Sequence, residues 1–388
     1  MSLDISSGDS LRLLCRVLSP DPQTRTRAVG ELSNESSAAA VAALAHSEDI
    51  LPALHAAVAD FPEALPKSER TQLAFAHEAN RRRNRQISEA VREIAAESLA
   101  HSIEVVALKG GRWAIEDAAG YAGWRSMLDI DILVGVGDYA AMPGVLAKLG
   151  YRAVRRERDF LGRQRFAGHY HLVAHHRSGQ SFVTEVHRHV EWRPELLPTE
   201  SIFEQSSEVG PGLRLPCLWH ATLHAIMHWQ IHHYGYQFGF HRVTDGIDIA
   251  KFLGRDDVDW SALAAHVSRV GIRREVDAAL VTVSELFGVP LPAGSTVSQE
   301  ARRYAARALR TRESRLSNWR AKQQQRLERL WHDHRLVYRM QMRGAGKMRI
   351  LSGVWATRFR RLPFLVSHFA SIVLLQTAEA IERALRRR

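Results

Sequence analysis

The chain has 388 residues, of which 45% are hydrophobic and 24% are charged, a composition that is typical of an ordinary globular protein and excludes a disordered one. Its two cysteines exclude a disulfide framework and a four-cysteine zinc site. The net charge of +11 is uneven, because residues 301–388 hold 22 lysines and arginines against 5 acidic residues, a charge of +17, which leaves −6 for the rest.

The N-terminal part is predicted to be helical. It starts without the basic residues and apolar run of a signal peptide, which favours a cytoplasmic protein. Residues 8–62 are rich in alanine and leucine, with breaks at Ser19-Pro20 and Phe61-Pro62. Residues 72–101 have helical periodicity. The buried stripe of that helix is expected to contain Leu73, Ala76, Ile87, Val91, Ile94 and Leu99.

Strands and helices then alternate. A strand is expected at 104–108, followed by a glycine turn and a helix at 112–119. A second strand is expected at 129–134, and a helix at 138–149 that ends at Gly150.

The second of these strands carries two aspartates spaced two residues apart, Asp129 and Asp131. Side chains alternate along a strand, so both carboxylates lie on one face and the intervening isoleucines on the other. Two adjacent buried acids are costly unless a cation lies near both. Mg²⁺ takes oxygen ligands and leaves positions for phosphate. The alternative is a pair of strand-end acids that cap nearby N–H groups.

An antiparallel pair is predicted at Gly168–His175 and Phe182–Val190, joined by Arg177-Ser-Gly-Gln180. The second strand is expected to present Glu185 as a third carboxylate next to the aspartates. The alternative is a solvated acid on an edge strand. The residues of this strand that share a face are Val183, Glu185, His187 and His189.

The order of these motifs resembles that of the uncharacterised bacterial nucleotidyltransferase-like family, within the polymerase-beta-like superfamily. That family carries an LKG turn, an R-x-M-x-D-I-D-x-L strand and an E-x-H strand. The matching segments here are Lys109-Gly110-Gly111, Arg125-Ser-Met-Leu-Asp129-Ile-Asp131-Ile-Leu and Glu185-Val-His187. The resemblance covers residues 70–255. It implies an α+β fold with a small mixed nucleotidyltransferase-type sheet surrounded by N- and C-terminal helices.

The resemblance also implies a function, the metal-dependent transfer of a nucleoside monophosphate from an NTP to an unknown acceptor hydroxyl. The implied catalytic and metal-binding residues, for Mg²⁺ or Mn²⁺, are Asp129, Asp131 and Glu185. The nucleotide is expected to contact Lys109, Gly110, Gly111, Arg125, His187 and His228. The superfamily usually carries a phosphate-touching serine where this chain has Gly111. That departure supports the alternative of a non-catalytic binding module.

Histidines recur every four residues on the helix predicted for Leu218–His233. Histidine pairs with this spacing can bind zinc, and aspartates further along could complete a site, so a zinc-dependent hydrolase is another alternative. The catalytic glutamate of an HExxH helix is missing. In the other readings, His224 or His228 contacts phosphate or substrate, or these histidines only make structural hydrogen bonds. The residues concerned are His220, His224, His228, His232, Asp245 and Asp248.

Further helices are predicted at 243–253 and 260–287, followed by a linker at 289–295 and a basic helical region. The apolar segment Phe364–Ala378 is too short for a membrane span. It is expected either to lie on an anionic membrane surface, which would make the protein peripheral to the inner membrane face, or to dock on the protein body. The excess of arginine suggests a large anionic partner, a nucleic acid or a membrane surface. The alternative is a set of solvated arginine faces on long helices.

These elements predict four regions. They are an N-terminal helical region (1–70), a nucleotidyltransferase-like domain (71–255), a helical extension (256–290) and a basic helical C-terminal region (296–388).

Overall fold

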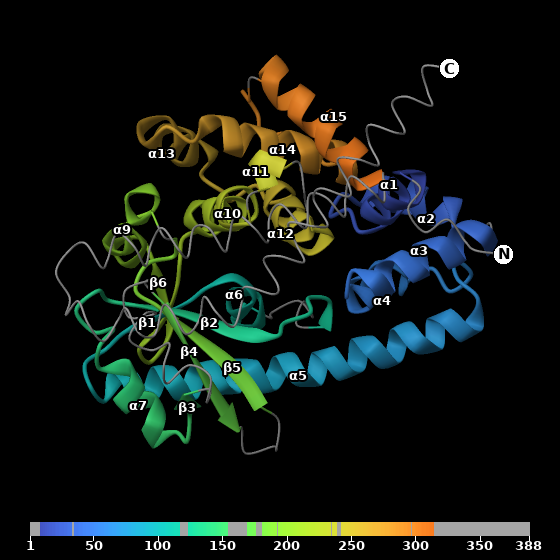
Figure 1. The fold of residues 1–388 in the computed structure, drawn as a ribbon. Coiled ribbons are helices and arrows are strands. Elements are labelled where there is room, and N and C mark those ends of the chain that lie inside the picture. Colours follow the sequence, from blue (N-terminus) through green and yellow to red (C-terminus); the bar gives the residue numbers. More distant parts are fainter. Residues whose placement is uncertain are drawn as a thin grey trace, which may run out of the picture. The chain divides into compact units, whose positions relative to one another are not determined.

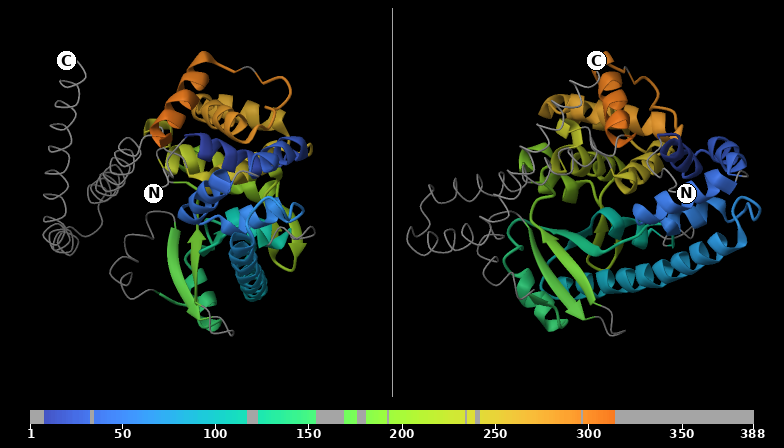
Figure 2. Two further views of the ribbon diagram at one scale, coloured as in Figure 1. Left: turned by 90° about the vertical axis from the view of Figure 1, so that its right-hand side faces the viewer. Right: turned by 45° about the vertical axis from the view of Figure 1, so that its right-hand side comes forward.

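The computed structural model describes the greater part of the chain, shown in Figures 1 and 2. The described residues are 8–32, 35–116, 123–153, 169–175, 181–191, 193–233, 235–238, 242–295 and 297–313. The predicted hairpin link at Arg177–Gln180 and the predicted helix at Phe364–Ala378 lie outside these ranges.

Within the described ranges, seven strands form one mixed sheet in the order β3-β4-β5-β2-β1-β7-β6 (Figure 1). The central strand β2 pairs parallel with β5 and antiparallel with β1. Strands β4 and β5 pair antiparallel, which confirms the predicted pairing. The strands are β1 (Val105–Ala107), β2 (Asp129–Val134), β3 (Arg152–Ala153), β4 (His169–His175), β5 (Ser181–His187), β6 (Ser207–Gly210) and β7 (Leu213–Leu215).

One face of the sheet packs on α5 (Lys67–Leu99) and α7 (Met142–Lys148), which lie beneath it in Figure 1. Ile130 and Ile132 of β2 are fully buried in this core, as the alternation of the strand predicts. The predicted stripe of α5 is buried except at two positions. Ala76 is half-buried, and Leu99 is 43% exposed because the helix ends at this residue.

The opposite face of the sheet is covered by helices that come before the strands in the sequence and by helices that come after them. Val106, Leu108 and Leu133 share one hydrophobic core with these helices. Helices α10 and α12 lie next to the sheet, and α13, α14 and α15 lie beyond them (Figures 1 and 2).

The α+β fold class is confirmed. The remaining helices are α1 (Gly8–Val17), α2 (Pro22–Glu31), α3 (Glu35–Ser47), α4 (Leu51–Val58), α6 (Lys109–Ile115), η2 (Pro194–Leu196), α9 (Thr199–Glu204), α10 (Leu218–Met227), η3 (His228–His232), α11 (Gly235–Phe238), α12 (Val243–Leu253), α13 (Trp260–Val270), α14 (Arg273–Phe287) and α15 (Gln299–Glu313).

Three of the predicted helices differ from those in the structure. Helix α6 begins at Lys109, three residues earlier than expected, so both glycines of the predicted turn lie in its first turn. Helix α7 begins at Met142 rather than at 138, because the preceding residues form turns. The helix expected at 260–287 is two helices, since Gly271 adopts a left-handed φ of 76° and ends α13.

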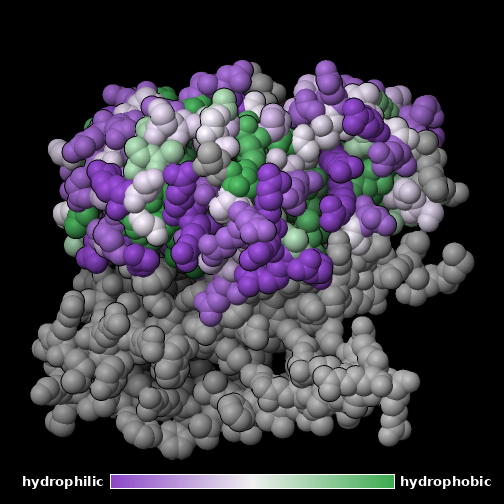
Figure 3. Space-filling model, turned by 90° about the horizontal axis from the view of Figure 1, so that it is seen from above, coloured by the Kyte–Doolittle hydropathy of each residue, from purple (hydrophilic) through white to green (hydrophobic). Residues whose placement is uncertain are grey.

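None of the described helices combines the length and the hydropathy that a membrane span requires. Figure 3 shows the molecule from above, and hydrophilic side chains cover most of its coloured face, with smaller hydrophobic areas between them.

Candidate functional site

The site is centred on the neighbouring strands β2 and β5. In their parallel register, Asp131 lies opposite Glu185, and Asp129 lies opposite Val183. Both aspartates alternate with the isoleucines of the lower core, so they belong to the face that α10 and α12 cover. Asp131 is 3% exposed, and Glu185 is half-buried beside it. The sheet therefore brings two carboxylates from strands about 50 residues apart to one buried position.

Lys109 reaches this position from the start of α6. The N–H of the preceding residue, Leu108, donates to the carbonyl oxygen of Asp131 at 3.0 Å, which fixes the start of the helix against β2. Lys109 has a φ of +45°, a conformation that is uncommon for residues other than glycine. Its Nζ donates to Oδ1 of Asp131 at 2.7 Å.

The two glycines of α6 differ in their surroundings. A Cβ at Gly110 would lie 2.5 Å from Sδ of Met127 and 2.9 Å from Nη1 of Arg125, so a larger residue there would have to displace these two side chains. A Cβ at Gly111 would meet the Cβ of Ala107 at 3.5 Å, an ordinary contact. The N–H of Gly111 donates to the carbonyl oxygen of Leu108 at 2.9 Å. Packing therefore disfavours a larger residue at Gly110 and not at Gly111.

Asp131, Glu185 and His187 form a close group, in which one possible ligand atom from each residue lies within 4.8 Å of the others. Nε2 of His187 is 2.9 Å from Oδ1 of Asp131 and 3.7 Å from Oε2 of Glu185. This set of two carboxylates and one imidazole could hold a divalent metal ion.

The ionisable groups of this site shift one another's pKa. Burial and the neighbouring Asp131 raise the pKa of Glu185 to about 7. Burial also acts to raise the pKa of Asp131, but the Lys109 ammonium and the His187 hydrogen bond hold it well below its usual range. Burial acts to lower the pKa of Lys109, yet the carboxylates of Asp131 and Glu185 raise it. The site therefore already requires one cation to keep Asp131 ionised.

Asp129 is half-buried at the start of β2 and is not a member of the close group. Burial and the charge of Asp131 raise its pKa. The structure thus brings together Asp131, Glu185, His187 and Lys109 from the predicted site, with Asp129 one step further along the same face.

Arg125, predicted to contact the nucleotide, is held by an acid that the sequence analysis assigned elsewhere. Its Nε and Nη2 donate to the carboxylate of Asp248 on α12 at 2.7–3.0 Å, and its Nη1 donates to the carbonyl oxygen of Ser126 at 3.1 Å. The carboxylate of Asp248 is thereby engaged by Arg125, although it lines the same cavity as His224 and His228. The ion pair is buried and ties α12 to the segment that enters β2.

Helix α5 fixes the same segment from the other side. Nδ2 of Asn80 donates to the carbonyl oxygens of Gly123 and Arg125, both at 2.9 Å, and Nδ2 of Asn84 donates to that of Arg125 at 2.8 Å. These bonds satisfy backbone groups that the strand ladder does not reach, so they position the start of β2.

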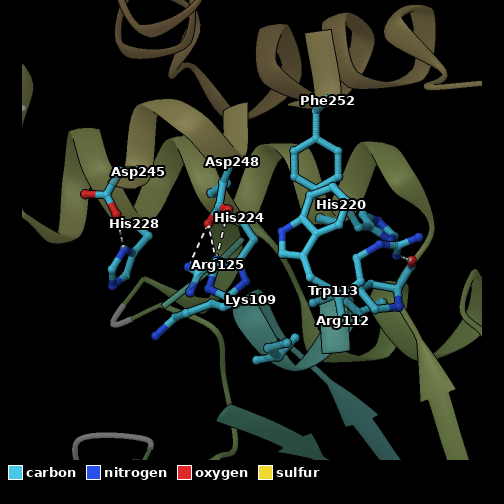
Figure 4. Close-up of a pocket in the computed structure, with 15 residues that line it drawn as sticks. Lys109, Arg112, Trp113, Arg125, His220, His224, His228, Asp245, Asp248 and Phe252 are labelled. Atoms are coloured by element: carbon cyan, nitrogen blue, oxygen red, sulfur yellow. Dashed lines mark hydrogen bonds and ion pairs between the residues drawn. The ribbon is translucent and has the colours of Figure 1, made fainter. Parts of the chain in front are cut away.

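The four predicted histidines of α10 and η3 do not form one site. His220 lies near Ser201 and Cys217, with Nε2 3.3 Å from Oγ and Nδ1 3.2 Å from Sγ. Burial lowers the pKa of His220 to about 4 and that of His224 to about 3, so both rings are neutral at physiological pH. His228 lies beside Asp245, with 3.8 Å between Nδ1 and Oδ1 (Figure 4).

A cavity of about 50 Å³ lies between α6, α10 and α12, shown in Figure 4. Sites for small ligands commonly measure roughly 300–1,000 Å³, so this one has room for a few waters only. Its polar lining residues include Lys109, Arg125, His224, His228 and Asp245.

Sequence reasoning missed two residues, one near His228 and one near His232. They are His233, which follows the last histidine of the predicted series, and Glu191, which follows β5. The adjacent pair His232-His233 was a visible signal. Glu191 carried none, because its approach to the histidines depends on the tertiary fold.

A family model described as an uncharacterised nucleotidyltransferase matches residues 34–288. No curated protein and no solved structure matches the chain.

Proposed function

This chain belongs to the family of uncharacterised nucleotidyltransferases, and from that premise we propose that it transfers a nucleoside monophosphate from an NTP to an acceptor hydroxyl. The proposal includes a divalent cation, Mg²⁺ or Mn²⁺, bound by Asp131 and Glu185 with Asp129 beside them.

The observation that carries the proposal is the position of the Lys109 ammonium, 2.7 Å from Oδ1 of a buried aspartate that adjoins a second carboxylate. Carboxylates packed together in this way repel one another, and burial makes that repulsion stronger. An ammonium is the cation that the chain itself can supply. A divalent ion with oxygen ligands fits the same donors and would neutralise more of their charge.

Each residue has a role in this proposal. Lys109 neutralises phosphate charge at the edge of the site. Glu185, next to Asp131 on the neighbouring strand, helps to activate the acceptor hydroxyl as a ligand of the cation. His187 orients Asp131 through its hydrogen bond. The acceptor oxygen bonds to the α-phosphorus, the bond to the β-phosphate oxygen breaks, and pyrophosphate leaves with the electron pair. A bound divalent cation would contribute charge neutralisation on the triphosphate.

Titration calorimetry of non-hydrolysable NTPs, with and without Mg²⁺, tests the proposal. We expect wild-type protein to bind at least one nucleotide in a Mg²⁺-dependent manner. Asp131→Asn should weaken that binding by at least about tenfold, or 1.4 kcal/mol. The matched control is Asp257→Asn, which removes the charge of an exposed aspartate paired with Arg255, and it should bind as the wild type does.

Two results would contradict the proposal. One is that folded wild-type protein binds none of the four nucleotides, which would favour a non-catalytic module. The other is equal binding by wild type and Asp131→Asn.

The proposed anionic partner of the basic residues 301–388 is a separate prediction, which retention on heparin before and after truncation at residue 314 would examine.

A further inference from the structure

Three histidines meet at the end of α10, outside the Asp131 group. His228, His232 and His233 each offer one ring nitrogen within 4.8 Å of those of the other two. The ring centroids of His228 and His233 are 4.1 Å apart, and those of His228 and His232 are 5.2 Å apart. We call these three residues the histidine cluster.

The backbone makes this cluster possible. Residues His228–His232 form a π-helical turn, in which the N–H of His233 donates to the carbonyl oxygen of His228 at 3.0 Å. In an α-helix with 3.6 residues per turn, positions 228 and 233 would point about 140° apart. The wider i→i+5 turn brings both, together with position 232, onto one side. Such turns are rare in proteins, and those that do occur are often found at functional sites.

Two carboxylates lie against these rings. Nδ1 of His233 is 3.5 Å from Oδ2 of Asp245, and Nδ1 of His228 is 3.8 Å from Oδ1 of the same residue. Nδ1 of His232 is 3.6 Å from Oε2 of Glu191, whose side chain is 1% exposed. Among the described residues, neither oxygen of Glu191 has a hydrogen-bond partner. Burying a carboxylate without hydrogen bonds is energetically costly, and a cation bound nearby would reduce that cost.

The sign of the local charge decides between ligands. Asp245 and Glu191 supply negative charge beside the three rings, which disfavours phosphate and favours a cation. Imidazole nitrogen is a preferred ligand of Zn²⁺ and related transition metals, whereas Mg²⁺ prefers oxygen. The carboxylates on the Nδ1 side match a recurrent arrangement in which a carboxylate orients a ligating histidine.

We propose that the histidine cluster binds a divalent transition-metal ion such as Zn²⁺ through Nε2 of His228, His232 and His233, with Asp245 and Glu191 orienting the rings. In tetrahedral zinc sites the ligand nitrogens lie about 3.3 Å apart, so ring nitrogens that lie within 4.8 Å of one another have to move only slightly closer on binding. Three protein ligands leave a fourth position open, and His232, at 41% exposure, gives an ion a path to the site. The site does not depend on the proposed nucleotidyl transfer, because it shares no residue with the Asp131 group.

The test uses the full-length protein, freed of metal with a chelator and then dialysed. Zn²⁺ is titrated against a chromogenic chelator in the presence of excess Mg²⁺, which occupies oxygen-rich sites. We expect one tightly bound Zn²⁺ per chain. Glu191→Gln, which keeps the shape of the side chain, should weaken this site by about 10–100-fold. His232→Ala removes a ligand and should weaken it further. Substitution of Co²⁺ should give visible absorption bands that His232→Ala changes.

Two control variants make the result specific. His55→Ala removes a ring from another close histidine pair, whose centroids are 4.7 Å apart, and should leave Zn²⁺ affinity unchanged. Asp131→Asn should also keep the tight Zn²⁺. The proposal is overturned if wild type binds no tight Zn²⁺, or if His232→Ala and Glu191→Gln bind it as wild type does. Loss of Zn²⁺ in Asp131→Asn alone would overturn it too, by assigning the ion to the other group.

Discussion

Removing the Lys109 ammonium should destabilise the protein and make its stability depend on metal. Lys109→Met keeps the length of the side chain and deletes the charge that lies 2.7 Å from Oδ1 of Asp131. Breaking a buried ion pair by removing one partner costs about 3–5 kcal/mol. We expect the lower end, about 3 kcal/mol, because His187 still contacts the same oxygen at 2.9 Å.

Magnesium should restore much of this loss, because the ammonium and a divalent ion compete for the same carboxylates. At a concentration 100 times the Kd of the variant, the ion adds about 2.7 kcal/mol to the free energy of unfolding. The gain from Mg²⁺ should be larger in Lys109→Met than in wild type. Urea unfolding followed by circular dichroism, in EDTA and in Mg²⁺, measures both free energies.

The matched control is Lys148→Met, which removes an exposed lysine whose Nζ lies 3.4 Å from Oε1 of Glu97. Surface pairs are worth at most about 1 kcal/mol, and this one should show no dependence on Mg²⁺. The reasoning is refuted if Lys109→Met is as stable as wild type in EDTA. It is also refuted if Mg²⁺ stabilises both proteins equally, since the ammonium would then not stand in the place of the cation.

Gly110→Ala should lower the free energy of unfolding by about 1–3 kcal/mol, because the new Cβ would lie 2.5 Å from Sδ of the buried Met127. Gly111→Ala, where the nearest atom lies at 3.5 Å, should cost much less, and equal losses in thermal or urea unfolding would contradict this difference. His220 should make stability fall as the pH drops from 6.5 towards 4, because its pKa is lowered to about 4 in the folded protein and the unfolded chain therefore binds the proton more readily. His220→Gln should reduce the pH dependence of the free energy of unfolding in that window. An unchanged dependence would contradict the prediction that His220 takes up a proton when the protein unfolds.

The sequence by itself determined the elements whose signals are local. The alternation of Asp129 to Val134 predicted the bounds of β2 and the faces of its side chains, since strand geometry depends only on neighbouring residues. The bounds of α12 followed from helical periodicity in the same way. The motif order identified the family, and the strand pairing that sets Glu185 beside Asp131 agrees with the motif-based expectation.

Only the tertiary structure decided which partners the charged groups take. Asp248 meets Arg125 across 123 positions of the chain, and His187 meets Asp131 across 56, so no local spacing records either contact. Because ionic interactions weaken with distance in space and not along the chain, the partners of a buried charge follow from the packing of whole elements. The histidine series shows the same limit, because its period of four predicted one helix face. The π-helical turn and the approach of Glu191 instead group His228 and His232 with His233.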